Sequence, residues 1–83
     1  MKGLPTRAEV EEIRRRYPKG TFVVLRYMDD TFSKIPEGTA GIVLHVDDAG
    51  TVHTKWENGS TLGFIVGVDS VEIIEKGSED DAG

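Results

Sequence analysis

Apolar and polar residues alternate through the middle of the chain, and turns that contain glycine interrupt the alternation at short intervals. Alternation with a period of two is typical of strands that bury one face. Residues 38–68 therefore predict three short strands joined by two tight turns. The first two of these strands are expected over Gly41–Asp47 and Thr51–Trp56.

The turn between these two strands, Asp48-Ala49-Gly50, fits a three-residue hairpin loop with Gly50 in the left-handed conformation. The resulting register brings three pairs to one mostly apolar face: Val46 with Val52, Leu44 with Thr54, and Ile42 with Trp56. The opposite face carries His45, His53 and Lys55. We expect the first face to be buried, with Trp56 in the core, and the second face to meet solvent.

The turn after Trp56 has two interpretations, and they bury different residues because a slip of one position exchanges the two faces of a strand. A two-residue turn at Asn58-Gly59 buries Thr61, Gly63 and Ile65. A three-residue loop over Glu57–Gly59 buries Leu62, Phe64 and Val66. We favour the longer loop because its set removes more apolar area from water, at about 25 cal/mol per Å².

A helix is predicted before the strands, over about Thr6–Arg16. Thr6 and Glu9 have the spacing of a capping box, and Pro18 and Gly20 end the segment. The apolar residues of the helix form a narrow stripe of Val10, Ile13 and Tyr17. Such a helix is expected to cover another element rather than to form the centre of a core.

The remaining segments complete a small β protein. Phe22–Met28 is apolar on both faces, so this strand is expected to be covered on both sides, with the helix on the second. A long loop follows over Asp29–Glu37, and a tight turn over Gly67–Ser70 precedes a last strand, Val71–Glu75. This order predicts a mainly β fold, a five-stranded SH3-like barrel with one short N-terminal α-helix.

The composition fits one small domain. The chain has 83 residues, near the lower limit for a self-sufficient core, and residues 1–75 are expected to form that domain. Residues 76–83 are predicted to be a disordered acidic tail. The chain has no cysteine, and residues 1–16 contain no apolar run long enough for a signal peptide. No apolar run approaches the roughly 20 residues that span a bilayer, so a cytoplasmic location is expected. The net charge of −5 makes generic binding to nucleic-acid phosphates unfavourable.

An ordered set of short motifs resembles one family. The motifs are Y-P-K-G-T at 17–21, M-D-D at 28–30, P-E-G-T-A-G at 36–41, V-D-D-A-G at 46–50, W-E-N-G-S at 56–60 and G-V-D-S at 67–70. Together, over about residues 4–75, they resemble the domain of unknown function 4314 family, small proteins of Gram-positive bacteria and their phages. The resemblance implies an SH3-like fold, a mobile-element setting and no catalytic residues. At the level of fold alone, the pattern is also similar to KOW and Tudor-like domains.

The two histidines are a candidate metal site, since the predicted register makes His45 and His53 cross-strand neighbours. Two imidazoles could hold Zn²⁺ or Ni²⁺ with Asp47 or water, but a site usually needs three or four ligands. The alternative, which we favour, is two polar residues on the solvent side of a sheet. No metal ion or cofactor is therefore expected.

Paired acids and exposed aromatic residues are the remaining candidates. Asp29-Asp30 and Asp47-Asp48 could share acid–base chemistry, although their positions also suit ordinary turns. Phe32 lies in the polar long loop, either as an anchor for a partner or folded back to close one end of the barrel. The residues predicted to contact a partner are Tyr27, Asp29, Asp30 and Phe32. The one basic cluster, Arg14, Arg15, Arg16 and Lys19, is interpreted as compensation of the helix dipole.

The sequence therefore favours a non-enzymatic binding module. It contains no G-x-S-x-G nucleophile motif, no P-loop and no dinucleotide-binding fingerprint. The partner is expected to be a host or phage protein, and a homo-oligomer is an open alternative; no membrane partner is expected. Two other hypotheses stay open: a nucleic-acid-associated KOW-like or Tudor-like module, and an anti-defence inhibitor that acts by acidic mimicry or ligand capture. A metal-assisted hydrolase built on His45 and His53 is the least favoured.

Overall fold

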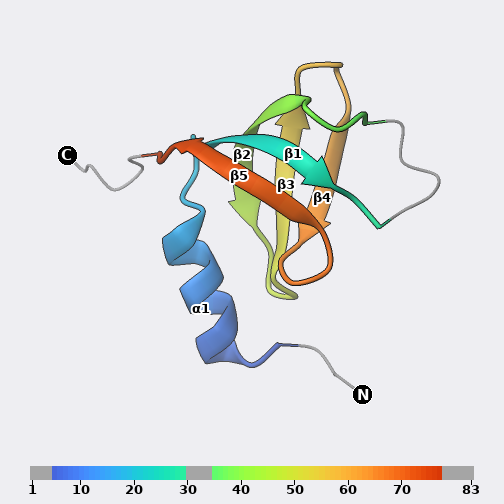
Figure 1. Ribbon diagram of the computed structural model, residues 1–83. Coiled ribbons are helices and arrows are strands. Elements are labelled where there is room, and N and C mark those ends of the chain that lie inside the picture. Colours follow the sequence, from blue (N-terminus) through green and yellow to red (C-terminus); the bar gives the residue numbers. More distant parts are fainter. Residues whose placement is uncertain (1–4, 30–34, 78–83) are drawn as a thin grey trace.

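A computed structural model describes residues 5–29 and 35–77, which form one α-helix and five β-strands (Figure 1). The elements are α1 (Arg7–Arg16), β1 (Phe22–Tyr27), β2 (Ala40–Val46), β3 (Thr51–Trp56), β4 (Thr61–Ile65) and β5 (Ser70–Glu75). The strands make one antiparallel sheet in the order β4-β3-β2-β1-β5. The mainly β fold is confirmed, and a five-stranded sheet with one short helix is compatible with the SH3-like architecture.

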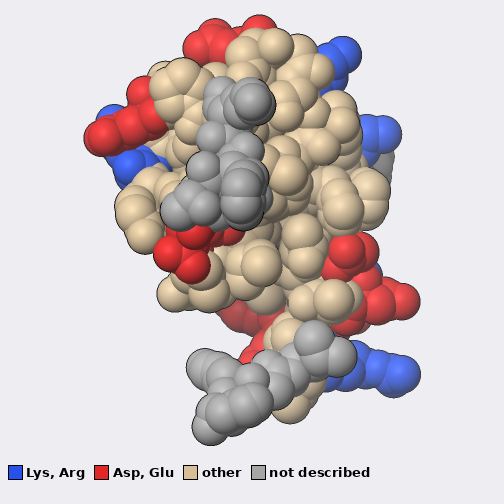
Figure 2. All heavy atoms as spheres, turned by 90° about the vertical axis from the view of Figure 1, so that its right-hand side faces the viewer, with Lys and Arg blue, Asp and Glu red and all other residues tan. Residues whose placement is uncertain are grey.

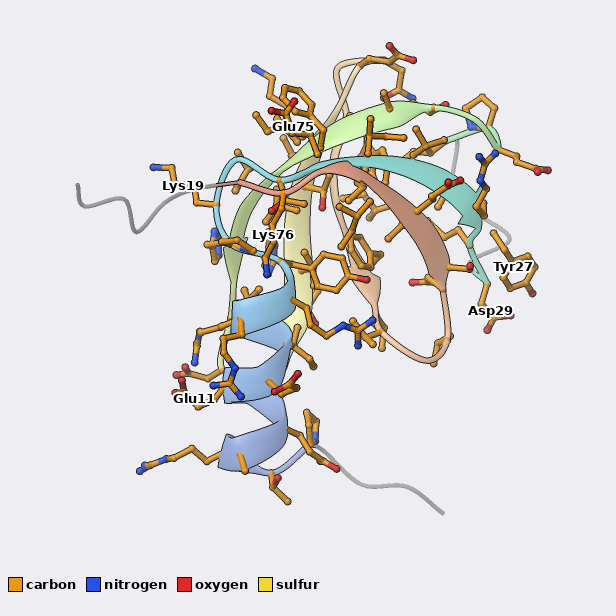
Figure 3. All side chains as sticks on the ribbon, turned by 60° about the vertical axis from the view of Figure 1, so that its left-hand side comes forward. Glu11, Lys19, Tyr27, Asp29, Glu75 and Lys76 are labelled. Atoms are coloured by element: carbon orange, nitrogen blue, oxygen red, sulfur yellow. The ribbon has the colours of Figure 1, made fainter. Side chains whose placement is uncertain are left out.

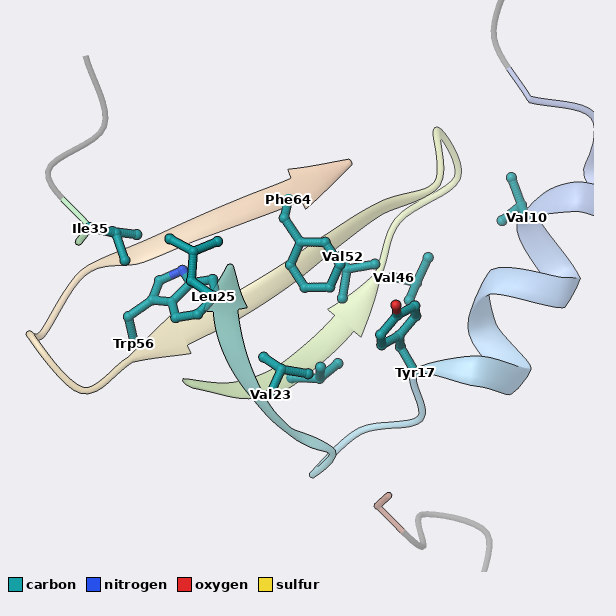
Figure 4. Close-up of a cluster of buried hydrophobic side chains, with 10 residues drawn as sticks. Val10, Tyr17, Val23, Leu25, Ile35, Val46, Val52, Trp56 and Phe64 are labelled. Carbon is teal, nitrogen blue, oxygen red and sulfur yellow. The ribbon is translucent and has the colours of Figure 1, made fainter. Parts of the chain in front are cut away.

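The sheet is strongly curled, because β2 bends along its length and β1 and β5 cross β3 and β4 at a steep angle (Figure 1). Ten buried apolar side chains form the core, and most of them gather in the space that the sheet encloses, while Val10 lies on the helix at one end (Figure 4). Trp56, Phe64 and Leu25 are the largest of the fully buried side chains. The ring of Phe64 meets Tyr17 edge to face, with 5.3 Å between ring centroids. The three aromatic side chains Tyr17, Trp56 and Phe64 therefore belong to the core, as expected for Trp56 and Phe64.

The helix begins at the predicted capping box. The Glu9 amide donates to the Thr6 hydroxyl (3.1 Å), and the Thr6 amide donates to the Glu9 carboxylate (2.8 Å). The Arg14 guanidinium holds the last turn against the β2–β3 hairpin by donating to the Val46 carbonyl (3.1 Å) and the Asp48 carboxylate (3.0 Å). In the described part of the chain, no helix combines the length and the apolar character needed to cross a membrane.

The expected position of the helix is wrong. The helix packs against β2 rather than over β1. Val23 and Leu25 face the core, but Phe22 on the other face of β1 is 46% exposed. Arg14 anchors the three-turn helix at the turn of the β2–β3 hairpin. The helix therefore covers one end of the curled sheet and leaves the outer face of β1 open.

The second hairpin has the predicted three-residue loop. The Trp56 amide donates to the Ser60 carbonyl (2.8 Å), and Gly59 has a φ of 93°. This register sets Phe64 opposite Val52, so that Phe64 is 1% exposed while its neighbour Ile65 is 49% exposed. The side chains that the longer loop was expected to bury, Leu62, Phe64 and Val66, are therefore the ones on the inner face of β4 and the residue after it.

The first hairpin differs from its predicted register beyond the first two pairs. Val46 pairs with Val52 and His45 with His53, as expected. A β-bulge between Val43 and His45 then shifts the register, so the expected pairs Leu44–Thr54 and Ile42–Trp56 are wrong. The observed partners are Val43 for Thr54, Ile42 for Lys55 and Gly41 for Trp56.

The indole of Trp56 explains this shift. A Cβ atom added at Gly41 would lie 2.6 Å from the indole Cε3 atom, closer than real Cβ contacts allow. Only glycine fits opposite the ring, so Gly41 rather than Ile42 takes the inner position. The bulge at Leu44 then lets both Val43 and Val46 face the core.

The last described residues belong to the folded domain. Glu75 is the final residue of β5, and the Gly77 amide donates to the Thr21 hydroxyl (2.9 Å). The rest of the predicted acidic tail, residues 78–83, lies outside the described residues.

Replacing Phe64 with alanine should lower the free energy of unfolding by about 3–5 kcal/mol, because it opens a cavity against Trp56 and Tyr17. The matched Ile65→Ala change should cost less than about 1 kcal/mol, because this side chain is half exposed. Urea denaturation of both variants and the wild type measures the difference. A larger loss in Ile65→Ala would show that the two-residue turn is the correct one.

Candidate functional site

The two histidines are neighbours, but their rings do not converge on a common point. They stack with 4.5 Å between ring centroids and 12° between planes. The lone pair of an imidazole nitrogen lies in the plane of its ring. The lone pairs of two parallel stacked rings therefore lie in parallel planes and do not point toward one metal ion. The His53 Nε2 atom also lies 2.8 Å from the Asp47 Oδ2 atom. Among residues 5–29 and 35–77, no group of three or more His, Asp or Glu side chains is placed to hold a metal ion.

Asp47 organises the β2–β3 hairpin. Its Oδ1 atom accepts hydrogen bonds from the backbone amides of Ala49 (2.9 Å) and Thr51 (3.0 Å). The hydrogen bond to His53 and then these amides favour the ionised carboxylate and lower the pKa of Asp47 below its ordinary value. The paired acids Asp47 and Asp48 therefore act in the turn: Asp47 caps it and Asp48 binds Arg14.

Two of the four residues predicted to contact a partner lie together at the end of β1 (Figure 3). The Tyr27 hydroxyl donates to the Asp29 carboxylate (3.0 Å), and this bond is the main cause of a raised pKa of Tyr27. Tyr27 is 56% exposed and takes no part in the core. The other two predicted residues, Asp30 and Phe32, lie outside the described residues, and so do both predicted roles of Phe32.

Asp69 completes this corner, and the sequence did not single it out. Its Oδ1 atom accepts from the Asp29 amide (2.8 Å), and its Oδ2 atom accepts from the Ile65 amide (2.9 Å). One carboxylate therefore joins the end of β1 to the end of β4. The G-V-D-S motif that contains Asp69 was the available signal, but it indicated only a turn.

Two grooves adjoin this corner, and we call the surface that they form the β4 face. The smaller groove, about 210 Å³, runs between the end of β1 and β4. The larger, about 860 Å³, lies between α1, the β2–β3 turn and the β4–β5 turn. The grooves share Ile65 and Val68, which are both about half exposed. Figure 2 shows that uncharged residues cover much of this side of the molecule, with acidic and basic residues around them.

The β4 face has one sign of charge. Among the described residues that line the two grooves, the acids are Glu9, Glu12, Asp29 and Asp69, and there is no Lys or Arg. The arginines at the end of α1 already have contacts within the chain, one of them with the groove acid Glu12. Arg14 binds the hairpin, Arg15 pairs with Glu12, and the Arg16 guanidinium lies 5.4 Å from the centre of the Tyr17 ring. An apolar surface with carboxylates at its margins suits an apolar, cationic ligand.

The fold and this surface define a small β protein with one helix and two adjoining grooves that share the exposed side chains Ile65 and Val68. Residues 6–74 match the family described as "Domain of unknown function (DUF4314)", and the chain belongs to this family. Neither the curated proteins nor the solved structures gave a significant match.

Replacing Asp47 with alanine should destabilise the protein by about 1–2 kcal/mol at pH 7, since a partly exposed carboxylate loses three hydrogen bonds. Because folding lowers the pKa of Asp47, its contribution is complete above the ordinary Asp pKa of about 3.9. The contribution is lost as the pH falls through the lower folded-state value. Denaturation curves at several pH values should therefore show the two proteins converging in acid.

Asp48→Ala is the matched control for this measurement. Its side chain is fully exposed and bonds only the Arg14 side chain among the described contacts. This variant should change the stability much less than Asp47→Ala. A difference between Asp47→Ala and wild type that grows with acidity would contradict the assigned pKa direction.

Proposed function

We propose that the chain is a small non-enzymatic binding module that holds a segment of a partner protein on the β4 face. The observation that carries the proposal is that two grooves meet at the half-exposed apolar side chains Ile65 and Val68. Contiguous apolar surface with a polar margin is typical of interaction sites. Here it occurs in a chain of which 30% of the residues are charged.

The chemistry of the face supports a particular class of partner segment. Apolar side chains of the partner would fill the grooves, and burial of this surface would supply most of the affinity. Lys or Arg residues beside them would meet the carboxylates of Glu9 and Asp29. Such charge complementarity increases the association rate and the specificity more than the affinity. Tyr27, beside the smaller groove, offers an exposed aromatic ring at its margin.

The same charges favour a protein over a nucleic acid as the partner. Carboxylates on the binding surface would repel phosphates, and the net charge of −5 adds to this repulsion. The family resemblance supports a phage or mobile-element setting and a cytoplasmic partner of the host or the phage. An anti-defence role would be one use of such a module, with a host defence protein as the partner.

Selection of a random peptide library against the purified chain tests the proposal. Enriched peptides should combine apolar residues with Lys or Arg. Ile65→Lys should weaken their binding by at least about tenfold, or about 1.4 kcal/mol, because it places a cation in both grooves. Isothermal titration calorimetry of the enriched peptides with each variant gives the dissociation constants.

Leu44→Lys provides the matched control. It introduces the same charge at an exposed apolar residue of β2 that lines neither groove, so binding should be unchanged. Equal binding to wild type and Ile65→Lys would place the peptides elsewhere and overturn the assignment of the face. Salt-sensitive binding of RNA or DNA that Ile65→Lys strengthens would instead favour the nucleic-acid hypothesis.

A further inference from the structure

The outer face of the sheet carries a second apolar surface, which shares no residue with the β4 face. Phe22 on β1 pairs with Ile42 on β2, and both side chains point away from the core-facing positions Val23 and Gly41. Phe22 is 46% exposed and Ile42 is half-buried. Ile74, at the bulge of β5 beside Phe22, is more exposed still. The helix leaves this pair open, since it packs near Val46 at the other end of β2.

Charged residues of opposite sign flank the apolar pair in the same row of the sheet. Phe22 pairs with Glu75 on β5, and Ile42 pairs with Lys55 on β3. Paired residues share a face, so one row across the outer side of the curled sheet reads Glu75, Phe22, Ile42, Lys55 over four strands. Figure 3 shows Glu75 on the outer side of the sheet.

The two charges do not neutralise each other within one chain. They are three strand positions apart, about 14 Å along the row. Within residues 5–29 and 35–77, neither side chain forms an ion pair. In the neighbouring row, by contrast, Arg26 already neutralises Glu72. The row therefore presents an acid at one end, a base at the other and apolar side chains between them.

This arrangement is complementary to a second copy of itself. Consider two copies packed with these faces together and related by a two-fold axis. The axis lies between the faces, runs parallel to the strands and passes between β1 and β2. This rotation reverses the order of the row in the second copy. Glu75 of each copy then meets Lys55 of the other, and each Phe22 meets an Ile42. Self-complementarity of this kind is what an isologous dimer interface requires.

We propose that the chain forms a two-fold dimer through the outer faces of β5, β1, β2 and β3, with Phe22 and Ile42 at its centre and two Glu75–Lys55 ion pairs at its edges. The dimer does not depend on the proposed partner binding. It identifies the surface and the symmetry of the homo-oligomer that the sequence left open.

Sedimentation equilibrium over a concentration series tests the dimer with reciprocal charge variants. Lys55→Glu and Glu75→Lys should each weaken self-association by at least about tenfold. Each change turns both Glu75–Lys55 ion pairs of the dimer into pairs of like charge. An equimolar mixture of the two variants should recover the wild-type affinity as a heterodimer, since every acid again meets a base. The mixture has the same mean net charge as the wild type, so recovery reports pairing rather than overall repulsion.

Two further variants test whether a change in self-association comes from this interface or from a general effect of charge. Glu11→Lys makes the same charge change as Glu75→Lys, but on α1, away from the row (Figure 3), and should leave self-association unchanged. Phe22→Ser should abolish the dimer, and circular dichroism checks that the variant is folded. A wild-type chain that stays monomeric at millimolar concentration, or a mixture that associates no better than its components, would overturn the proposal.

Discussion

The packing of the Trp56 indole against Gly41 is the constraint on which the rest of the structure depends. The ring is fully buried, donates from Nε1 to the Leu62 carbonyl (3.0 Å), and leaves no room for a Cβ atom opposite it. Gly41 must therefore face inward, which turns Ile42 outward beside Phe22. The bulge at Leu44 returns Val46 to the core and sets His45 against His53 on the outside. One large side chain thus fixes what lies inside and also which apolar residues the outer face presents.

The second constraint is that the curled sheet has two edge strands, β4 and β5, which do not pair with each other. A sheet of five short strands in the order β4-β3-β2-β1-β5 leaves β4 and β5 as edges, and unpaired edges expose backbone groups. The Asp69 carboxylate meets part of this need by accepting from the amides of Asp29 and Ile65. A side chain that bridges two strand ends holds them in place without filling the space beside them. The grooves next to Ile65 and Val68 follow from this way of closing the corner.

Local patterns in the sequence predicted the elements that local interactions determine. The capping box at Thr6, both three-residue loops and the inner position of Phe64 follow from spacing, turn chemistry and apolar area, and the structure confirms them. The bulge at Leu44 was not predictable in this way, because its cause is a contact between Gly41 and Trp56 on different strands. The same holds for the candidate site. The Tyr27–Asp29 pair spans two residues, whereas the bond from Asp29 to Asp69 spans forty. Grooves made by α1 and two distant turns have no signature in any one segment.

The two proposed surfaces are geometrically compatible, and their combination has a consequence for binding. In the sheet order, β4 is at the far end of the row from the two-fold axis between β1 and β2. The axis therefore carries the two copies of β4 to opposite edges of a dimer, where neither β4 face is covered by the other chain. A dimer of this kind would display two equivalent sites pointing apart. Such a module would bind a repeated or oligomeric partner with greater avidity than one site provides, provided that the partner can span both sites. A partner with a single site would gain nothing from the second copy, so the dimer would favour repeated surfaces over isolated chains.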